Sequence, residues 1–235
     1  MQAIQHIFPW TEQTDWFWPD DDVKLLQVID DVNDVADIVE KHVPKRYPLQ
    51  QYWGTCVQAG AACGIWPRRL SSLFQKVYTV EPLAENIECA RENLATVGNV
   101  ELFQGVLGSG KEPGGRVGME QHPNEQRNAG SQQVAPLPNN GDAFLANQLY
   151  GVTTIDGIVG DDATVDFICL DLEGYELFAL QGAQQTIDRC SPVIMVEDKG
   201  LSRKFGVQQG AVLQWLSDRG YRVLETIKRD VVLGR

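Results

Sequence analysis

Short apolar segments alternate with amphipathic ones through most of this chain, and this alternation constrains the fold more than any other feature. Strands are predicted over residues 55–59, 77–80, 100–103, 165–170 and 193–196. Helices are predicted over 23–43, 65–74, 84–97, 175–188 and 209–218, where apolar residues recur every three or four positions. Such alternation is typical of a parallel sheet with crossover helices. Two final strands, over 221–226 and 230–233, are joined by a short turn and should be antiparallel neighbours.

The two parts of the chain outside this alternation differ from it in composition. Residues 1–50 combine an aromatic segment, which contains Trp10, Trp16 and Trp18, with the first helix, and we expect them to form an accessory or lid region. Residues 51–235 should form the main domain, with an insertion at about 108–141 that is rich in Gly, Pro, Asn and Gln. We expect this insertion to be a long loop or hairpin outside the core.

The role of the three tryptophans is open at this stage. With part of the insertion, they could cover a substrate site, because flat apolar side chains give a large contact area and suit sugar faces. Alternatively, they could simply pack the extra helix on the main domain. The sequence supports both interpretations.

Charge and composition exclude several classes of function. The chain of 235 residues carries a net charge of −12, which disfavours a bulk nucleic-acid substrate. No apolar run approaches the roughly 18 residues of a membrane span, and the first twenty residues contain no Lys or Arg, so no export signal is expected. The five cysteines and three histidines show no metal-ligand spacing. We therefore expect a soluble, cytoplasmic protein without a Cys or His metal site.

A glycine turn follows the first strand of the main domain and opens a helix. The segment from Gly60 to Gly64 would let the backbone turn sharply and approach a ligand closely, and the helix that follows would offer free N–H groups to an anion. A tight turn without any ligand explains the two glycines equally well. A ligand-binding role for this turn therefore needs further evidence from elsewhere in the chain.

That support comes from Glu81, at the end of the second strand. It lies 21 residues after Gly60, close to the spacing of about 20 residues expected for an acid that accepts hydrogen bonds from ribose hydroxyls. A solvated acid at a strand end is the alternative. With the glycine turn, the pair favours a nucleoside-binding site.

A third group of polar residues follows the strand over 165–170. Asp171 and Glu173 should reach the carboxyl edge of the sheet, where ligands bind in open α/β folds. Glu176 is expected to cap the next helix. The acids Glu197 and Asp198 end the following strand, and Lys199 comes directly after them.

These residues together resemble FkbM-type methyltransferases. The resemblance runs from about Gly54 to the C-terminus, without the insertion, and rests on these segments: 57–64, 80–82, Asn86, 92–94, 100–102, 106–108, 154–156, 171–176, 182–183 and 192–197. It implies a Rossmann-like class I methyltransferase fold, α/β with a seven-stranded, mostly parallel sheet and an antiparallel C-terminal strand. It also implies S-adenosylmethionine as cofactor and O-methylation of a hydroxyl on a sugar, glycan or natural product.

The resemblance and the strand ends together give a set of candidate site residues. The cofactor-binding candidates are Gln58, Gly60, Ala61, Gly64, Glu81, Pro82, Asn86, Gln104, Gly105, Val106 and Asp171. Of these, the resemblance implies that residues 104–106 flank the adenine. Two positions depart from the family, which usually has an acid at the position of Gln58 and Asn at that of Ala62. A glutamine can form a hydrogen bond to the methionine end of the cofactor but carries no charge to pair with its amino group.

For catalysis, methyl transfer to an oxygen requires a group that accepts the hydroxyl proton. The candidates are Asp171 as base, with Glu173 beside it and Lys199 as the nearby positive charge. A hard divalent cation on the carboxylates is an alternative, and we expect a metal-independent site because Lys199 can supply the charge.

The sequence also bears on two other functions, a short-chain dehydrogenase and a non-catalytic protein. A short-chain dehydrogenase is disfavoured because no Tyr is followed by Lys four positions later. A non-catalytic protein that keeps the fold remains the alternative, since Gln58 replaces the family acid. The sequence does not identify the acceptor or the oligomeric state.

Overall fold

A seven-stranded sheet organises the computed structural model, which describes residues 1–20, 22, 25–45, 49–112, 115–121, 132–135, 149–161 and 163–235. The strand order is β12-β13-β11-β10-β3-β4-β5. The strands are β3 (Trp53–Ala59), β4 (Phe74–Glu81), β5 (Val100–Gln104), β10 (Val165–Leu170), β11 (Val193–Glu197), β12 (Arg222–Ile227) and β13 (Asp230–Gly234). Neighbours from β11 to β5 are parallel, and β13 is antiparallel to both β11 and β12. The predicted Rossmann-like α/β fold, a seven-stranded, mostly parallel sheet with an antiparallel C-terminal strand, is confirmed.

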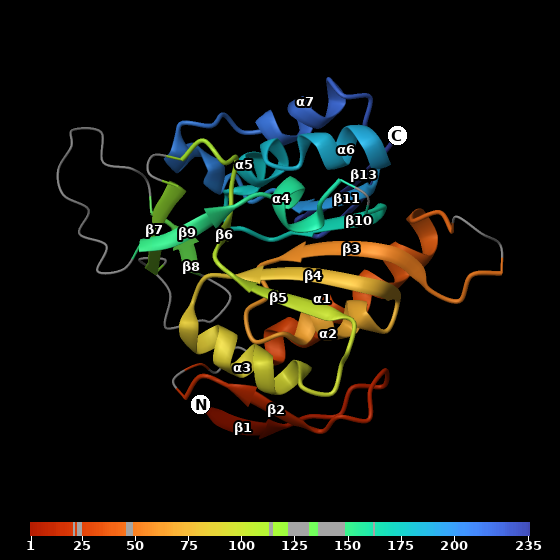
Figure 1. The fold of residues 1–235 in the computed structure, drawn as a ribbon, viewed down its shortest axis with the longest axis vertical. Helices are drawn as coiled ribbons and strands as arrows, with labels where there is room; N and C mark the ends of the chain where they lie inside the picture. The colour runs from red at the N-terminus through yellow and green to blue at the C-terminus, as the bar shows by residue number, and fades with distance from the viewer. Residues whose placement is uncertain are drawn as a thin grey trace.

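Helices cover both faces of this sheet (Figure 1). One face is covered by α4 (Ile155–Val159), α5 (Glu176–Gln181), α6 (Gln184–Cys190) and α7 (Ala211–Ser217), and the other by α1 (Leu25–His42), α2 (Ile65–Ser71) and α3 (Ala84–Leu94). A hydrophobic core lies on each side of the sheet. All six residues of β10 are therefore buried, and five of them are apolar, as is typical of a central parallel strand; the sixth is Asp166. Among the described residues, no helix combines the length and the apolar character of a membrane span.

The N-terminal aromatic segment forms an antiparallel hairpin of β1 (Gln2–Gln5) and β2 (Asp15–Trp18). Figure 1 shows it at the outer side of α3. Trp16 and Trp18 are buried and pack with Ile65 and with Cys89 of α3, while Trp10 is partly buried against the same cluster. These contacts favour the packing interpretation of the tryptophans, because none of the three lines the cavity described below.

The insertion contributes to a second, four-stranded sheet of order β6-β9-β7-β8. Its strands are β6 (Val106–Leu107), β7 (Arg116–Gln121), β8 (Gln132–Val134) and β9 (Leu149–Thr153). Val117 and Val134 are buried there, so the expectation that the insertion lies wholly outside any core is wrong for its described part. Its other predicted residues, 113–114, 122–131 and 136–141, lie outside the described residues.

Two predicted helices differ in the structure: one is divided into two helices, and the other is shorter than predicted. The helix expected over 175–188 is interrupted at Gly182, where a Cβ would lie 2.0 Å from the carbonyl oxygen of Gly108. The close approach of these two backbone segments permits only glycine at this break. The helix expected over 65–74 stops at Ser71, and Phe74 starts β4 instead. A short apolar run does not by itself distinguish a helix from a buried strand.

Candidate functional site

A cavity opens at the carboxyl ends of β3, β4 and β10. After β3 the chain builds β4 and β5 on one side and then returns to place β10 on the other, so β3 and β10 border the point where the strand order reverses. Ligands bind at such points in open α/β sheets. Of the sequence-predicted site residues, those that line the cavity are Gly60, Glu81, Pro82, Gly105, Val106 and Asp171.

The glycine turn serves mainly to bring backbone segments together. Gly60 has a φ of 84°, and a Cβ there would lie 2.3 Å from the carbonyl oxygen of Asp171. Gly64 has a φ of 87° and faces Ala90 of α3, where a Cβ would meet the Ala90 Cα at 3.1 Å. Both positions require glycine for conformation and space. Gly64 therefore packs the turn against α3 and does not line the cavity.

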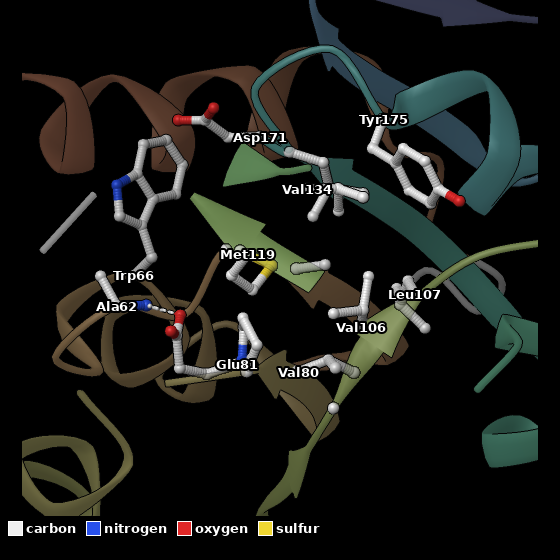
Figure 2. Close-up of a pocket in the computed structure, with 15 residues that line it drawn as sticks. Ala62, Trp66, Val80, Glu81, Val106, Leu107, Met119, Val134, Asp171 and Tyr175 are labelled. Atoms are coloured by element: carbon white, nitrogen blue, oxygen red, sulfur yellow. Dashed lines mark hydrogen bonds between the residues drawn. The ribbon is translucent and has the colours of Figure 1, made fainter. Parts of the chain in front are cut away.

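Several N–H groups of the glycine turn itself are used within the protein; the expected free N–H groups belong to the helix that follows, α2, and that expectation stays a prediction. The N–H groups of Gly60 and Ala61 both donate to Val80 O at 3.3 Å, and that of Gly64 donates to Ala61 O at 2.8 Å. The N–H of Ala62 donates to Glu81 Oε2 at 2.9 Å (Figure 2). These donors stabilise the turn itself. An anion at this turn would have to be held by groups other than these four N–H groups.

Glu81 is a buried carboxylate that accepts three hydrogen bonds from neighbouring groups of the protein. Besides Ala62 N, its oxygens accept from Leu83 N at 3.1 Å and from Asn86 Nδ2 at 3.0 Å. Burial raises the pKa of Glu81 to about 7, although these three donors lower it in part. A carboxylate offers about four lone-pair sites, so Glu81 retains acceptor capacity for a hydroxyl donor. Asn86 does not line the cavity; it acts on the site by donating a hydrogen bond to Glu81.

Gln58 acts inside the protein and does not reach the cavity. Its side chain is buried, its amide nitrogen donates to Gly60 O at 3.0 Å, and its oxygen accepts from the Thr79 hydroxyl. The residue therefore fixes the carbonyl that begins the glycine turn. Ala61 is buried outside the cavity, and Gln104 is exposed beside Pro82, to whose carbonyl it donates at 3.5 Å.

The candidate catalytic residues form one cluster with Glu197. Carboxylate oxygens of Asp171, Glu173 and Glu197 lie within 4.8 Å of one another. Lys199 Nζ lies 2.7 Å from Glu197 Oε1 and 3.1 Å from Glu173 Oε1. Asp171 extends from this cluster into the cavity. Asp198 lies outside it, since its N–H continues the β-structure by donating to Arg229 O at 3.0 Å.

Burial and like charge control the ionisation of this cluster. Burial raises the pKa of the Glu197 carboxyl, and the Asp171 carboxylate raises it further, against the opposite effect of Lys199. Burial lowers the pKa of Lys199, but the carboxylates of Asp171, Glu197 and Glu173 outweigh it and the net shift is upward. Lys199 is therefore an ammonium ion within bonding distance of the carboxyl groups of Glu173 and Glu197.

The loop after β10 has a backbone that holds Asp171 and Glu173 in place. Glu173 has a φ of 51° and Gly174 a φ of 99°, so two successive residues lie in the left-handed region. This conformation is unfavourable for Glu173 and is kept where the surroundings enforce it. Glu176 Oε1 accepts from Leu172 N at 3.0 Å and Gly174 N at 3.1 Å, so this side chain holds the loop before α5. Glu176 lies in the first turn of α5, as predicted, but the N-cap is Tyr175 and no side-chain hydrogen bond caps the helix.

Several lining residues were not identified from the sequence. They are Ala59, Ala62, Trp66, Val80, Leu107, Met119, Val134, Leu172 and Tyr175. Trp66 lies two residues beyond Gly64, and this proximity was its only signal. Met119 and Val134 belong to the insertion, whose composition gave no sign that its strands return to the site.

The chain was then compared with known proteins. A family model described as the methyltransferase FkbM domain matches residues 68–223. No curated protein matches the chain in sequence. A solved structure of methyltransferase FkbM from Methylobacillus flagellatus KT is 18% identical, with a TM-score of 0.47, and the match covers 80% of this chain but only 45% of that one. A SAM-dependent methyltransferase from Aquifex aeolicus is also 18% identical, with a TM-score of 0.47 and coverage of 91% and 93%. A putative methyltransferase from Streptococcus mutans, solved in complex with SAH, is 13% identical with a TM-score of 0.46 and coverage of 86% and 94%.

Proposed function

Because this chain belongs to the FkbM methyltransferase domain family, we propose that it transfers a methyl group from S-adenosylmethionine to a hydroxyl of a sugar, glycan or natural product. The observation that supports this most directly is the position of Glu81. Its buried carboxylate lies at the end of β4, lines the same cavity as Gly60 and Asp171, and retains acceptor capacity.

The residues of the cavity fit this cofactor. Glu81 would accept hydrogen bonds from the ribose hydroxyls, and the apolar side chains of Pro82 and Val106 would lie against the adenine, with Gly105 leaving room beside them. Gln58 carries no charge and is occupied by Gly60 and Thr79. Asp171 is then the acid that remains for the cofactor's amino group as well as for the acceptor.

The cluster around Asp171 would handle the proton of the acceptor. S-adenosylmethionine supplies an electrophilic methyl group on a sulfonium sulfur. Asp171 takes the proton that the acceptor hydroxyl loses as its oxygen becomes methylated, and Lys199 keeps Glu173 and Glu197 in position. Because Lys199 already bonds two of the carboxylates, the reaction needs no divalent cation.

A methyl-transfer screen against hydroxylated sugars, glycolipids, peptides and nucleotides tests this function. With an accepted substrate, Asp171→Asn should lower kcat by at least about 100-fold, as expected for loss of a general base. Exhaustive chelation should leave the wild-type rate unchanged. A fully active Asp171→Asn protein rules out Asp171 as the base, and activity that disappears with chelator and returns with Mg²⁺ rules out the metal-free site. No binding of either S-adenosylmethionine or S-adenosylhomocysteine would leave only a non-catalytic role.

A further inference from the structure

The wall of the cavity is apolar over most of its surface. Trp66 of α2, Met119 of β7 and Val134 of β8 contribute to it from three separate elements (Figure 2). Glu81 and Asp171 are the carboxylic acids among the described lining residues, and these residues include no Lys, Arg or His. A ligand in this cavity therefore meets apolar side chains and carboxyl groups.

The part of this wall that comes from the insertion is held by the fold. β7 pairs with β9 from Arg116↔Gly151 to Gly118↔Leu149, and β9 in turn pairs with β6, which follows β5 of the main sheet. Val134 is buried in one cluster with Val117 and with Tyr175, the residue just before α5. Next to Val134, Gln133 Oε1 accepts a hydrogen bond from Lys204 Nζ of the short helix η2 (Leu201–Phe205). Met119 and Val134 are thus fixed at the cavity by contacts on two sides.

The ammonium group nearest to Asp171 is already compensated. Lys199 Nζ bonds Glu197 and Glu173 at 2.7 and 3.1 Å, so its charge is balanced within the cluster. A phosphate or carboxylate on a ligand would be brought beside Asp171, with Glu81 on the same cavity. Like charges at a partly buried site repel strongly, and a desolvated anion without a partner is costly. S-adenosylmethionine would bring its own ammonium group to Asp171, and that group balances the cofactor's carboxylate. An acceptor with a phosphate or carboxylate brings no such group, so the described walls of the cavity disfavour an anionic acceptor.

We propose that this cavity selects a methyl acceptor that carries no negative charge and presents a flat apolar face beside its hydroxyl, such as an aryl glycoside or a hydroxylated aromatic natural product. Trp66 offers a planar surface for such a face, and Met119 and Val134 complete the apolar wall. Acceptors that carry a phosphate or a carboxylate, including sugar phosphates, are rejected. This inference rests on the proposed function and narrows its acceptor class.

Binding of matched probes to the protein saturated with S-adenosylhomocysteine tests the selectivity without requiring turnover. The probes are phenyl β-glucoside and its 6-phosphate, titrated by ligand-detected NMR. We expect the neutral probe to bind at least about ten-fold more tightly, because like charges placed together in an interface are strongly unfavourable. Met119→Lys should reduce this ratio by placing a cation in the wall. Leu149→Lys, at an exposed position of β9 in the same sheet, should leave the ratio unchanged.

Three outcomes overturn the inference: equal or tighter binding of the 6-phosphate by the wild-type protein, no binding of the neutral probe, or the same ratio in a folded Met119→Lys protein. A protein that shows the expected ratio but methylates no acceptor contradicts the proposed function and leaves the selectivity of the cavity standing. The two failures are therefore distinguishable.

Discussion

Ala62 adopts a backbone conformation that an alanine side chain disfavours. Its φ is 43°, in the left-handed region, and its N–H is held there by Glu81 Oε2. Glycine visits this region freely, and asparagine does so more readily than alanine. The family resemblance implies Asn at this position, and the backbone gives the physical reason.

We therefore predict that Ala62→Asn and Ala62→Gly stabilise the protein. Relief of the left-handed strain is worth about 1 kcal/mol, which corresponds to a rise in Tm of roughly 2–4 °C for a chain of this size. Thermal unfolding of both variants beside the wild type measures it. A lower Tm in both variants would show that the strain is absent or is compensated by the alanine methyl group.

Glu176 makes stability depend on pH in the direction opposite to an ordinary surface acid. Burial raises its pKa to about 7, against the lowering effect of the N–H groups of residues 176, 174 and 172. Its folded pKa is then above the unfolded value of about 4.3, so the folded state binds more protons between these values. The contribution of Glu176 to stability is greatest below about pH 4.3 and declines as the pH rises towards 7.

Urea unfolding of the wild type and of Glu176→Gln at pH 5, 6 and 7 measures this effect. The free energy of unfolding of the wild type should fall relative to that of Glu176→Gln as the pH rises. Glu92→Gln, at an exposed position of α3, is the control. A difference between wild type and Glu176→Gln that is constant over this range would contradict a raised pKa for Glu176.

The β1–β2 hairpin is attached to the domain through α3 and the glycine turn. Asn93 Oδ1 accepts from Phe17 N at 2.8 Å, while Asn93 Nδ2 donates to Phe17 O at 2.9 Å and to Cys63 O at 2.6 Å. One side chain thus joins the hairpin, α3 and the turn that begins at Gly60. The hairpin therefore helps to hold the turn that begins at Gly60, and none of its described residues lines the cavity.

Trp16→Ala should therefore destabilise the whole domain. Trp16 is fully buried, and removal of a buried aromatic side chain costs about 3–5 kcal/mol. Trp10→Ala, at a partly buried position of the same cluster, should cost clearly less. Chemical unfolding of the two variants tests the packing interpretation. A Trp16→Ala protein of wild-type stability that has lost methyl transfer would instead favour a role over the acceptor site.

The elements that the sequence predicted well are those with long, strictly periodic patterns. α1, β10 and the antiparallel pair β12–β13 follow the predicted ranges closely. β10 and β13 are buried runs, whereas β12 is largely exposed and was predicted from its pairing with β13 across a short turn. The break at Gly182 was missed because its cause is a contact with Gly108, which is distant in sequence. The antiparallel pair β7–β8 agrees with the hairpin that was one expected form of the insertion. The bounds of these strands were not predicted because their short segments lie among residues without periodicity.

At the scale of the whole molecule, the sequence predicted which strand ends form the site but not all of the residues that line its cavity. Strand ends in a parallel sheet meet at one edge, so Gly60, Glu81 and Asp171 could be brought together from their spacing alone. The cluster of Asp171 and Glu173 with Glu197 and Lys199 follows from the adjacent position of β11. The positions of Met119 and Val134 depend on how the insertion folds back, which spacing does not predict. Gln58 does not line the cavity and instead bonds Gly60 O and the Thr79 hydroxyl.

The central claim is that this cavity binds the adenosyl cofactor through Glu81. Isothermal titration of S-adenosylhomocysteine into the wild type and into Glu81→Gln tests it most directly. Hydrogen bonds to a charged group are worth about 1.5–3 kcal/mol, so Glu81→Gln should weaken binding by roughly ten-fold to over a hundred-fold. Below about pH 7, where burial leaves Glu81 increasingly protonated, the wild-type affinity should fall towards that of the variant. A folded Glu81→Gln protein that binds as tightly as the wild type at pH 8 would contradict the account.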